Sequence, residues 1–152
     1  MQLNLFYYCN YLHQVGFSTT EIGFLWSVGV VAEIIMFAFA HVFLTRFFWR
    51  YLVSLCLVLT GIRWMIVGLL PNSFMAQFLA QTIHAFSFGL FHMIAMRVVF
   101  QNFSIGQQGR GQAMYSTMWG LGVALGSILA GRYWQLISGE VIFIIAGFAT
   151  FM

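Results

Sequence analysis

Long apolar runs separated by short polar breaks dominate the chain. A helix needs about 20 apolar residues to cross the hydrocarbon core of a bilayer, and four of the runs reach that length. A shorter apolar run lies at each end, so we expect truncated first and last helices and a chain that is a fragment. The pattern predicts an all-α membrane protein, a bundle of about six transmembrane helices. The expected spans are 1–14 (partial), 20–45, 51–71, 74–101, 112–136 and 139–152 (partial).

The breaks between the full spans contain turn-forming residues. Positions 47–50 form an aromatic and basic corner, 71–73 a proline turn, and 102–111 a polar, glycine-rich loop. Thr19 or Thr20, followed by Glu21, is expected to begin the first full span, with a carboxylate in its first turn.

Composition agrees with lipid as the main solvent. The chain is 62% hydrophobic and 6% charged, and it contains no Lys and no Asp. A water-soluble domain covers much of its surface with charged residues, so most of the surface of this chain is expected to face the bilayer. The net charge of +3 is small and spread thinly, which argues against nucleic acid as a partner.

The arginines predict an orientation. Arg46 and Arg50 lie in one loop, Arg110 lies in the loop two crossings later, and Arg97 is in the turns that lead to it. Arg132 alone lies near the other side. By the positive-inside rule, the loops of Arg46, Arg50 and Arg110 are expected in the cytoplasm.

Three ionisable residues fall at overlapping depths inside consecutive full spans: Glu33, Arg63 and His84. By the helical rise, Arg63 and His84 lie roughly 12–15 Å below the outer surface and Glu33 roughly 20 Å below it. A charge at this depth is costly, so each needs a partner or a water-filled cavity. Glu33 and Arg63 are expected to pair. The pair either serves a functional site or is a buried ion pair that sets helix register.

A narrow polar stripe follows the third full span. Its members fall within an arc of about 80° on a helical wheel, opposite an apolar face. Amides, imidazoles and one aromatic ring on one face suit the lining of a pocket for a small organic ligand, whereas an isolated histidine is more often a satisfied core residue. The candidate lining residues are Gln77, Gln81, His84, Phe88 and His92.

Metal, haem and enzymatic chemistry have little support. His84 and His92 lie about 12 Å apart along a helix, too far for one metal ion, so neither a metal nor a cofactor is expected. No nucleophile motif, phosphate loop or carboxylate pair occurs, so the protein is not expected to be an enzyme.

Small residues in the fourth full span, at Gly122, Gly126 and Ala130, predict ordinary tight helix packing or, alternatively, a sliding surface. Several aromatic residues nearer the span ends are assigned to the interfacial belt. They are Trp49, Tyr51, Trp119, Tyr133 and Trp134.

Four stretches together resemble the major facilitator superfamily, in its phenylpropionate-permease-like branch, which is related to the lactose permease group. They are GFSTTEIGFLWSVGVVAEIIMFAF (16–39), GIRW (61–64), QTIHAFSFGLFHMIAMRVV (81–99) and GRGQAMYSTMWGLGVALGSILAG (109–131). The resemblance covers essentially the whole chain as helices seven to twelve of twelve. It implies half of a major facilitator fold, a missing N-terminal six-helix half, and a proton symporter in a bacterial inner membrane.

The resemblance also implies roles for particular residues. Arg63 and His84 match an arginine and a histidine that serve sugar binding and proton coupling in lactose permease. Glu33 is displaced by about a turn from the acidic residue of that group. Ser87 stands where the group has its proton-carrying glutamate, so the proton-coupling set is expected to be Glu33, Arg63 and His84, with Glu33 titrating.

The expected function is therefore secondary active transport of a small organic solute, an aromatic acid or a sugar or nucleoside, by alternating access. Two other classes remain open. One is a channel or passive facilitator in which the charged residues are structural. The other is a membrane scaffold or redox protein that uses the histidines.

Overall fold

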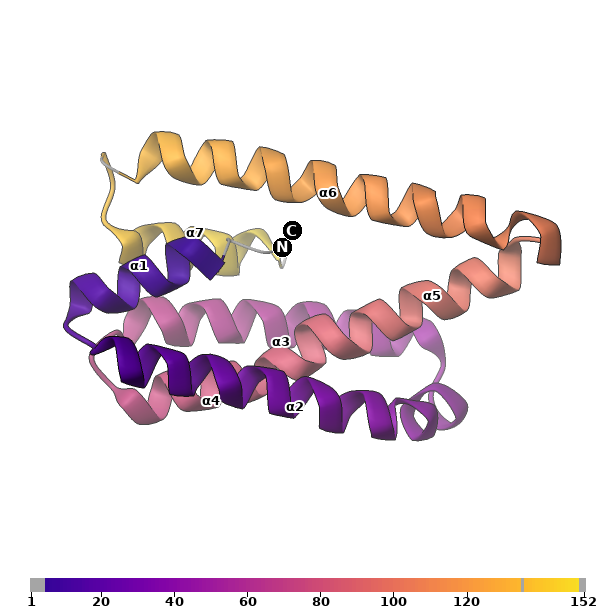
Figure 1. Cartoon of the computed structure of the whole chain (residues 1–152), viewed down its shortest axis with the longest axis horizontal. Coiled ribbons are helices and arrows are strands. Elements are labelled where there is room, and N and C mark those ends of the chain that lie inside the picture. Colours follow the sequence, from indigo (N-terminus) through magenta and orange to yellow (C-terminus); the bar gives the residue numbers. More distant parts are fainter. Residues whose placement is uncertain (1–4, 135, 151–152) are drawn as a thin grey trace.

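The computed structural model describes residues 5–134 and 136–150, and every regular element in this part of the chain is helical (Figure 1). The expected first and last helices therefore lie partly outside the described residues. The helices are α1 (Leu5–Val15), α2 (Thr19–Arg46), α3 (Trp49–Leu69), α4 (Phe74–His84), η1 (Ala85–Leu90), α5 (Phe91–Asn102), η2 (Ile105–Gln107), α6 (Gln108–Tyr133) and α7 (Gly139–Ala149).

Four helical stretches are long and apolar enough to cross a membrane, namely 19–46, 49–69, 74–102 and 105–133. The third consists of α4, η1 and α5 in continuity, and the fourth of η2 followed by α6. The four full spans and the all-α membrane fold that the apolar pattern predicts are thus confirmed.

The first full span begins at Thr19, one of the two predicted positions, with Glu21 in its first turn, whereas α6 begins earlier than expected. The N-cap of α2 is Ser18, whose hydroxyl accepts a hydrogen bond from the Glu21 backbone N–H at 3.3 Å. The Glu21 carboxylate accepts from the Ser18 backbone N–H at 2.8 Å, which completes a capping box. The α6 helix begins at Gln108, inside the expected loop. Its first turn packs closely on α5, where a Cβ at Gly111 would lie 2.7 Å from Val99 Cγ1.

Helices α3 and α7 approach each other most closely at glycine residues. A Cβ at Gly68 would lie 2.9 Å from the backbone oxygen of Glu140, and one at Gly147 would lie 3.1 Å from that of Gly61. Close backbone approach of this kind is how membrane helices gain van der Waals contact, since lipid leaves little hydrophobic drive between them.

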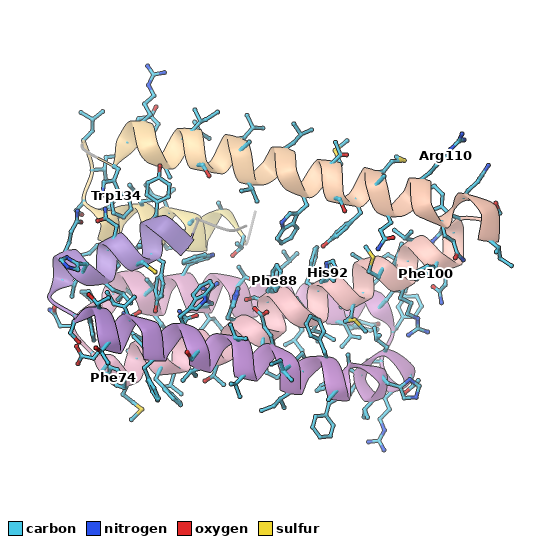
Figure 2. The ribbon with its side chains drawn as sticks, in the orientation of Figure 1. Phe74, Phe88, His92, Phe100, Arg110 and Trp134 are labelled. Carbon is cyan, nitrogen blue, oxygen red and sulfur yellow. The ribbon has the colours of Figure 1, made fainter. Side chains whose placement is uncertain are left out.

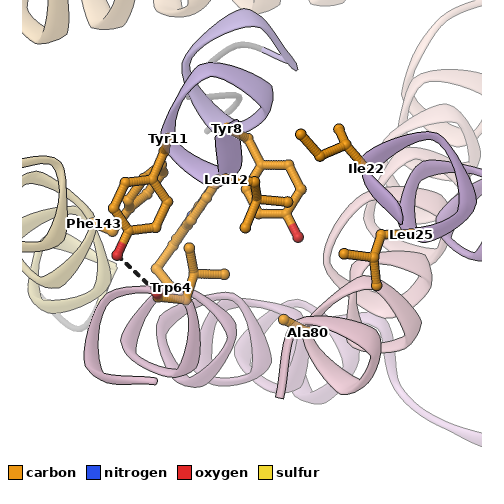
Figure 3. Packing of buried hydrophobic residues seen from close by; sticks show 9 residues of the cluster. Tyr8, Tyr11, Leu12, Ile22, Leu25, Trp64, Ala80 and Phe143 are labelled. Atoms are coloured by element: carbon orange, nitrogen blue, oxygen red, sulfur yellow. Dashed lines mark hydrogen bonds between the residues drawn. The ribbon is translucent and has the colours of Figure 1, made fainter. Parts of the chain in front are cut away.

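A cluster of buried side chains lies beside this contact and joins α1 to it (Figure 3). Phe143 is fully buried, stacks on Trp64 with ring centroids 5.2 Å apart, and meets Tyr11 at 4.9 Å. The Tyr11 hydroxyl donates to the backbone oxygen of Val67 at 3.3 Å, so the aromatic ring is buried while its polar end is satisfied.

Helix α2 packs on α4 and η1, which in turn pack on α3. Gly89 of η1 lies against Met36 of α2, where a Cβ would be 3.6 Å from Met36 Cγ. Near the end of α2, the Arg97 guanidinium donates to the backbone oxygen of Leu44 and so satisfies a carbonyl that has no partner within its own helix.

Helix α6 lies along one side of the bundle and approaches α5 at one end (Figure 1). Cβ atoms built at Gly120, Gly122 and Gly126 would meet nothing within 4 Å in the described chain. The expected tight packing of Gly122 and Gly126 is therefore wrong for the described part of this chain. Gly126 and Ala130 instead border an apolar cavity of about 510 Å³ between α6 and α7.

The packing of α3 on α7 generates a prediction. Gly68→Ala places a methyl group against the α7 backbone, and overpacking of this kind is expected to lower the free energy of unfolding by about 1–3 kcal/mol. Thermal unfolding in detergent, followed by far-UV circular dichroism, measures the effect.

Gly23→Ala is the matched control, because a Cβ there meets nothing within 4 Å in the described chain. It is expected to be neutral or stabilising by about 0.5–1 kcal/mol, since alanine is the better helix former. Equal destabilisation by both variants would contradict the role of Gly68.

Candidate functional site

A contact between a histidine and a carboxylate on two helices forms the centre of the candidate site. Nε2 of His84, at the end of α4, lies 2.9 Å from Oε1 of Glu33 in α2, and the two side chains are 13% and 19% exposed. The expected pairing of Glu33 with Arg63 is therefore wrong among the described residues. The reason is the order of the helices: α4 and η1 pack directly on α2, while Arg63 lies on α3 beyond them.

Arg63 is buried on α3 without a carboxylate partner in the described chain. Its guanidinium carbon lies 4.4 Å from the ring centroid of Trp64, a cation–π contact, and its Nε has no hydrogen-bond partner among the described residues. Glu33 and Tyr8 are near enough to interact with it electrostatically. Arg63 thus leaves its Nε donor unused inside the described part of the bundle.

A cavity of about 200 Å³ lies between α2 and the α4–η1 stretch. Gln81, 1% exposed, has no hydrogen-bond partner for Oε1 or Nε2 within the described residues. A buried polar group without a partner costs free energy, so an amide in this position suits a ligand that supplies the missing bonds. The cavity is lined by Trp26, Gly29, Val30, Glu33, Gln81, His84 and Phe88.

The helix that carries most of the candidate residues changes form next to the ion pair. Directly after His84, residues Ala85–Leu90 form a π-helix, a form found often at functional sites. Phe88 stacks on His84 at 5.5 Å and 20° and on His92 at 6.3 Å and 17°. These three predicted stripe residues therefore form one ladder of rings.

Two other residues of the predicted stripe lie outside the cavity. Gln77 is fully buried, accepts a hydrogen bond from the Tyr8 hydroxyl at 3.2 Å and donates to the backbone oxygen of Leu70 at 3.2 Å. It thereby links α1, α4 and the end of α3. Nδ1 of His92 lies 3.1 Å from the Tyr115 hydroxyl, and this hydrogen bond joins α5 to α6.

The structure brings three aromatic residues to the site that sequence reasoning missed. Trp119, assigned above to the interfacial belt, instead meets Phe88 edge-on at 5.6 Å and 64°, so that assignment is wrong. Tyr115 lies one turn earlier on the same face of α6 and contacts His92. Trp26 lines the cavity from α2. The sequence signal for Trp26 was its spacing of three and seven residues to Gly29 and Glu33, which places the three on one face of the helix.

Figure 2 shows Phe88 and His92 on the side of the third span that faces α6. The ring ladder therefore has the Glu33–His84 ion pair at one end and α6 at the other. The site is a set of ionisable and aromatic groups shared by three spans.

Membrane-spanning helices around an ionisable, partly unpaired interior define a multi-pass membrane protein with a polar site inside its bundle. Residues 3–145 match the family model described as "MFS_1 like family", and the chain belongs to this family. The resemblance to the major facilitator superfamily is thus confirmed. Proteins of this family are membrane transporters and not enzymes.

The chain is also 30% identical over 141 residues to the "Probable 3-phenylpropionic acid transporter" of Escherichia coli (strain K12). The match covers 90% of this chain and 36% of the relative, so the chain spans little more than a third of that protein's length. No solved structure matches the chain.

The observed ion pair predicts a specific energetic coupling. In a double-mutant cycle of Glu33→Gln and His84→Gln, the two changes are expected to be non-additive by about 0.5–3 kcal/mol, since the side chains are in direct contact. Thermal or denaturant unfolding of the four proteins in detergent gives this coupling energy.

A second cycle, of Glu33→Gln with Arg63→Gln, serves as the comparison. Its coupling is expected to be smaller, because no ion pair joins these two side chains in the described structure. A coupling as large as that of the first cycle would contradict the assignment of His84 as the preferred partner of Glu33.

Proposed function

We propose that this chain is the C-terminal six-helix half of a secondary active transporter, a proton symporter that works by alternating access. The observation that carries the proposal is the Glu33–His84 ion pair beside a cavity with unpaired polar groups, inside membrane-spanning helices. Polar groups at this depth are costly and mark solute or ion pathways. Family membership supports the same assignment.

The partner that this proposal requires is an N-terminal six-helix half of the same transporter. The solute binds near the midplane between the two halves, as in other transporters built from repeats. The protein lies in a bacterial inner membrane, with the loops of Arg46, Arg50 and Arg110 in the cytoplasm. The exposed, unpacked glycine face of α6 suits a protein neighbour as well as lipid.

Glu33 is the proposed proton-carrying group. As a carboxylate it accepts a hydrogen bond from Nε2 of His84, and protonation would remove its negative charge from this contact. The Ser87 hydroxyl donates to the backbone oxygen of His84 at 3.1 Å and has no acidic proton to exchange in the physiological range. The coupling role therefore falls to Glu33, with His84 as its partner and Arg63 as a nearby counter-charge.

An aromatic acid is the proposed solute. Arg63 has the planar donor group that binds a carboxylate through two hydrogen bonds, and its Nε is unsatisfied in the described structure. The unpaired amide of Gln81 lies in the cavity with His84 and Phe88. The name of the 3-phenylpropionic acid relative supports this solute class. Gln77 and His92 have a supporting role along the proposed route. Gln77 forms hydrogen bonds with α1 and the end of α3, and His92 forms one with α6.

The proton-coupling role predicts a separation of two activities. In the complete protein, Glu33→Gln is expected to abolish accumulation of 3-phenylpropionate against its gradient, because the amide cannot carry the proton. Exchange of labelled for unlabelled acid across the membrane is expected to continue. Both are measured in proteoliposomes with an imposed pH gradient.

Glu21→Gln is the matched control, since Glu21 is an exposed carboxylate at the start of the same helix and is expected to leave accumulation intact. Proton-driven accumulation by Glu33→Gln at the wild-type level would show that another group carries the proton. Equilibration without accumulation by the wild-type protein would indicate a passive facilitator.

The role of Arg63 predicts a change in acid affinity. Arg63→Gln is expected to weaken the apparent affinity for 3-phenylpropionate by roughly tenfold or more, because hydrogen bonds to charged groups are among the strongest. Arg63→Lys is expected to recover part of the lost affinity, since lysine keeps the positive charge but cannot donate two parallel hydrogen bonds to the carboxylate. Concentration-dependent uptake gives the affinities. Arg132→Gln, at an exposed position near the end of α6, is the control.

A further inference from the structure

Trp26 is an aromatic side chain in the cavity to which the transport proposal gives no role. It lies on the same face of α2 as Gly29, Val30 and Glu33, which line the cavity with it. Trp26 is 37% exposed, and its indole takes part in no ring–ring contact with the aromatic side chains of the described residues. Trp26 therefore lines the same cavity as Glu33 and His84 without being stacked on another ring of the described residues.

Phe88, the other aromatic ring of the cavity, is placed differently. His84 lies one turn before it and His92 one turn after it, and both imidazoles stack on it at angles of 20° or less. Its third neighbour, Trp119, meets its edge. A solute ring would have to displace an imidazole to reach the face of Phe88, whereas the indole of Trp26 needs no such displacement.

The cavity also has a polar side within reach of Trp26. Gly29, one turn along α2, carries no side chain, and a Cβ there would lie 3.3 Å from Oε1 of Gln81. Glu33 lies seven residues from Trp26, about 10 Å along the helix axis. One aromatic ring and a short acidic chain would fit between the indole and the hydrogen-bond donors of Gln81 and His84 in the cavity of about 200 Å³.

We propose that Trp26 is a specificity-determining residue, whose indole stacks on the aromatic ring of the transported acid. The proposal rests on the proposed function and names the group that selects an aromatic over a saturated ring. Tryptophan offers a large, rigid apolar face with a polarised π-system, which an aromatic ring can complement and a saturated ring cannot.

The test compares two acids that share a carboxylate and chain, 3-phenylpropionate and 3-cyclohexylpropionate. The complete wild-type protein is expected to prefer the phenyl acid by roughly three- to tenfold in apparent affinity, the range of an aromatic pair. Trp26→Leu is expected to bring the ratio of the two affinities close to one while uptake of both acids persists. Trp26→Phe is expected to retain most of the preference.

Phe39→Leu is the matched control, because Phe39 is a 59% exposed aromatic residue of the same helix that does not line the cavity. It is expected to leave the ratio at the wild-type value. A wild-type ratio in Trp26→Leu would overturn the proposal, and more clearly so if Phe88→Leu lost the preference. Wild-type protein that transports neither acid would instead overturn the proposed function on which this inference rests.

A binding measurement covers the case in which Trp26→Leu fails to fold. A heavy bromine atom quenches an indole that it touches, so 3-(4-bromophenyl)propionate is expected to quench part of the tryptophan fluorescence of the purified wild-type protein in detergent. That part is expected to be missing in Trp26→Phe. Equal quenching of the two proteins would show that the ring binds elsewhere.

Discussion

Hydrocarbon offers no hydrogen-bond partners, and the placement of nearly every polar side chain in this bundle follows from that constraint. Gln77 satisfies the end of α3 and the hydroxyl of Tyr8, and Arg97 satisfies a carbonyl near the end of α2. Nε2 of His84 and Oε1 of Glu33 satisfy each other. Against this background, the amide of Gln81, Nδ1 of His84 and Nε of Arg63 are exceptions that have no partner among the described residues. Gln81 and His84 line the cavity, where a polar solute gains most from binding.

The same bundle combines a tightly packed part and a loosely attached one. Glycines bring α3 and α7 into backbone contact, and the buried aromatic cluster of α1 covers that contact. By contrast, two contacts join the middle of α6 to the third span. Trp119 meets the ring of Phe88 edge-on, and the Tyr115 hydroxyl forms a hydrogen bond with His92. The ring ladder therefore connects the ion pair to the least packed helix, a suitable arrangement if the ion pair changes during a transport cycle.

Burial also divides the aromatic residues by role. Trp64 and Phe143 have their faces covered by each other and serve packing, and Phe88 is covered by two imidazoles. Trp26 lines the cavity, is 37% exposed and stacks on no other ring of the described residues. An aromatic ring that is already stacked stabilises the bundle, whereas an uncovered ring beside unpaired polar groups offers a complementary surface to a solute with one aromatic and one acidic end.

The amino-acid sequence alone predicted the all-α membrane fold and the four full spans, because apolar length is a local quantity. It also placed His84, Phe88 and His92 on one face. The partner of Glu33 was decided by the tertiary structure, since α4 and η1, and not α3, lie directly against α2. Three further features also depend on which helices are neighbours: the π-helix after His84, the contact of Trp119 with Phe88 and the position of Trp26 in the cavity. Periodicity along one helix carries no information about its neighbours.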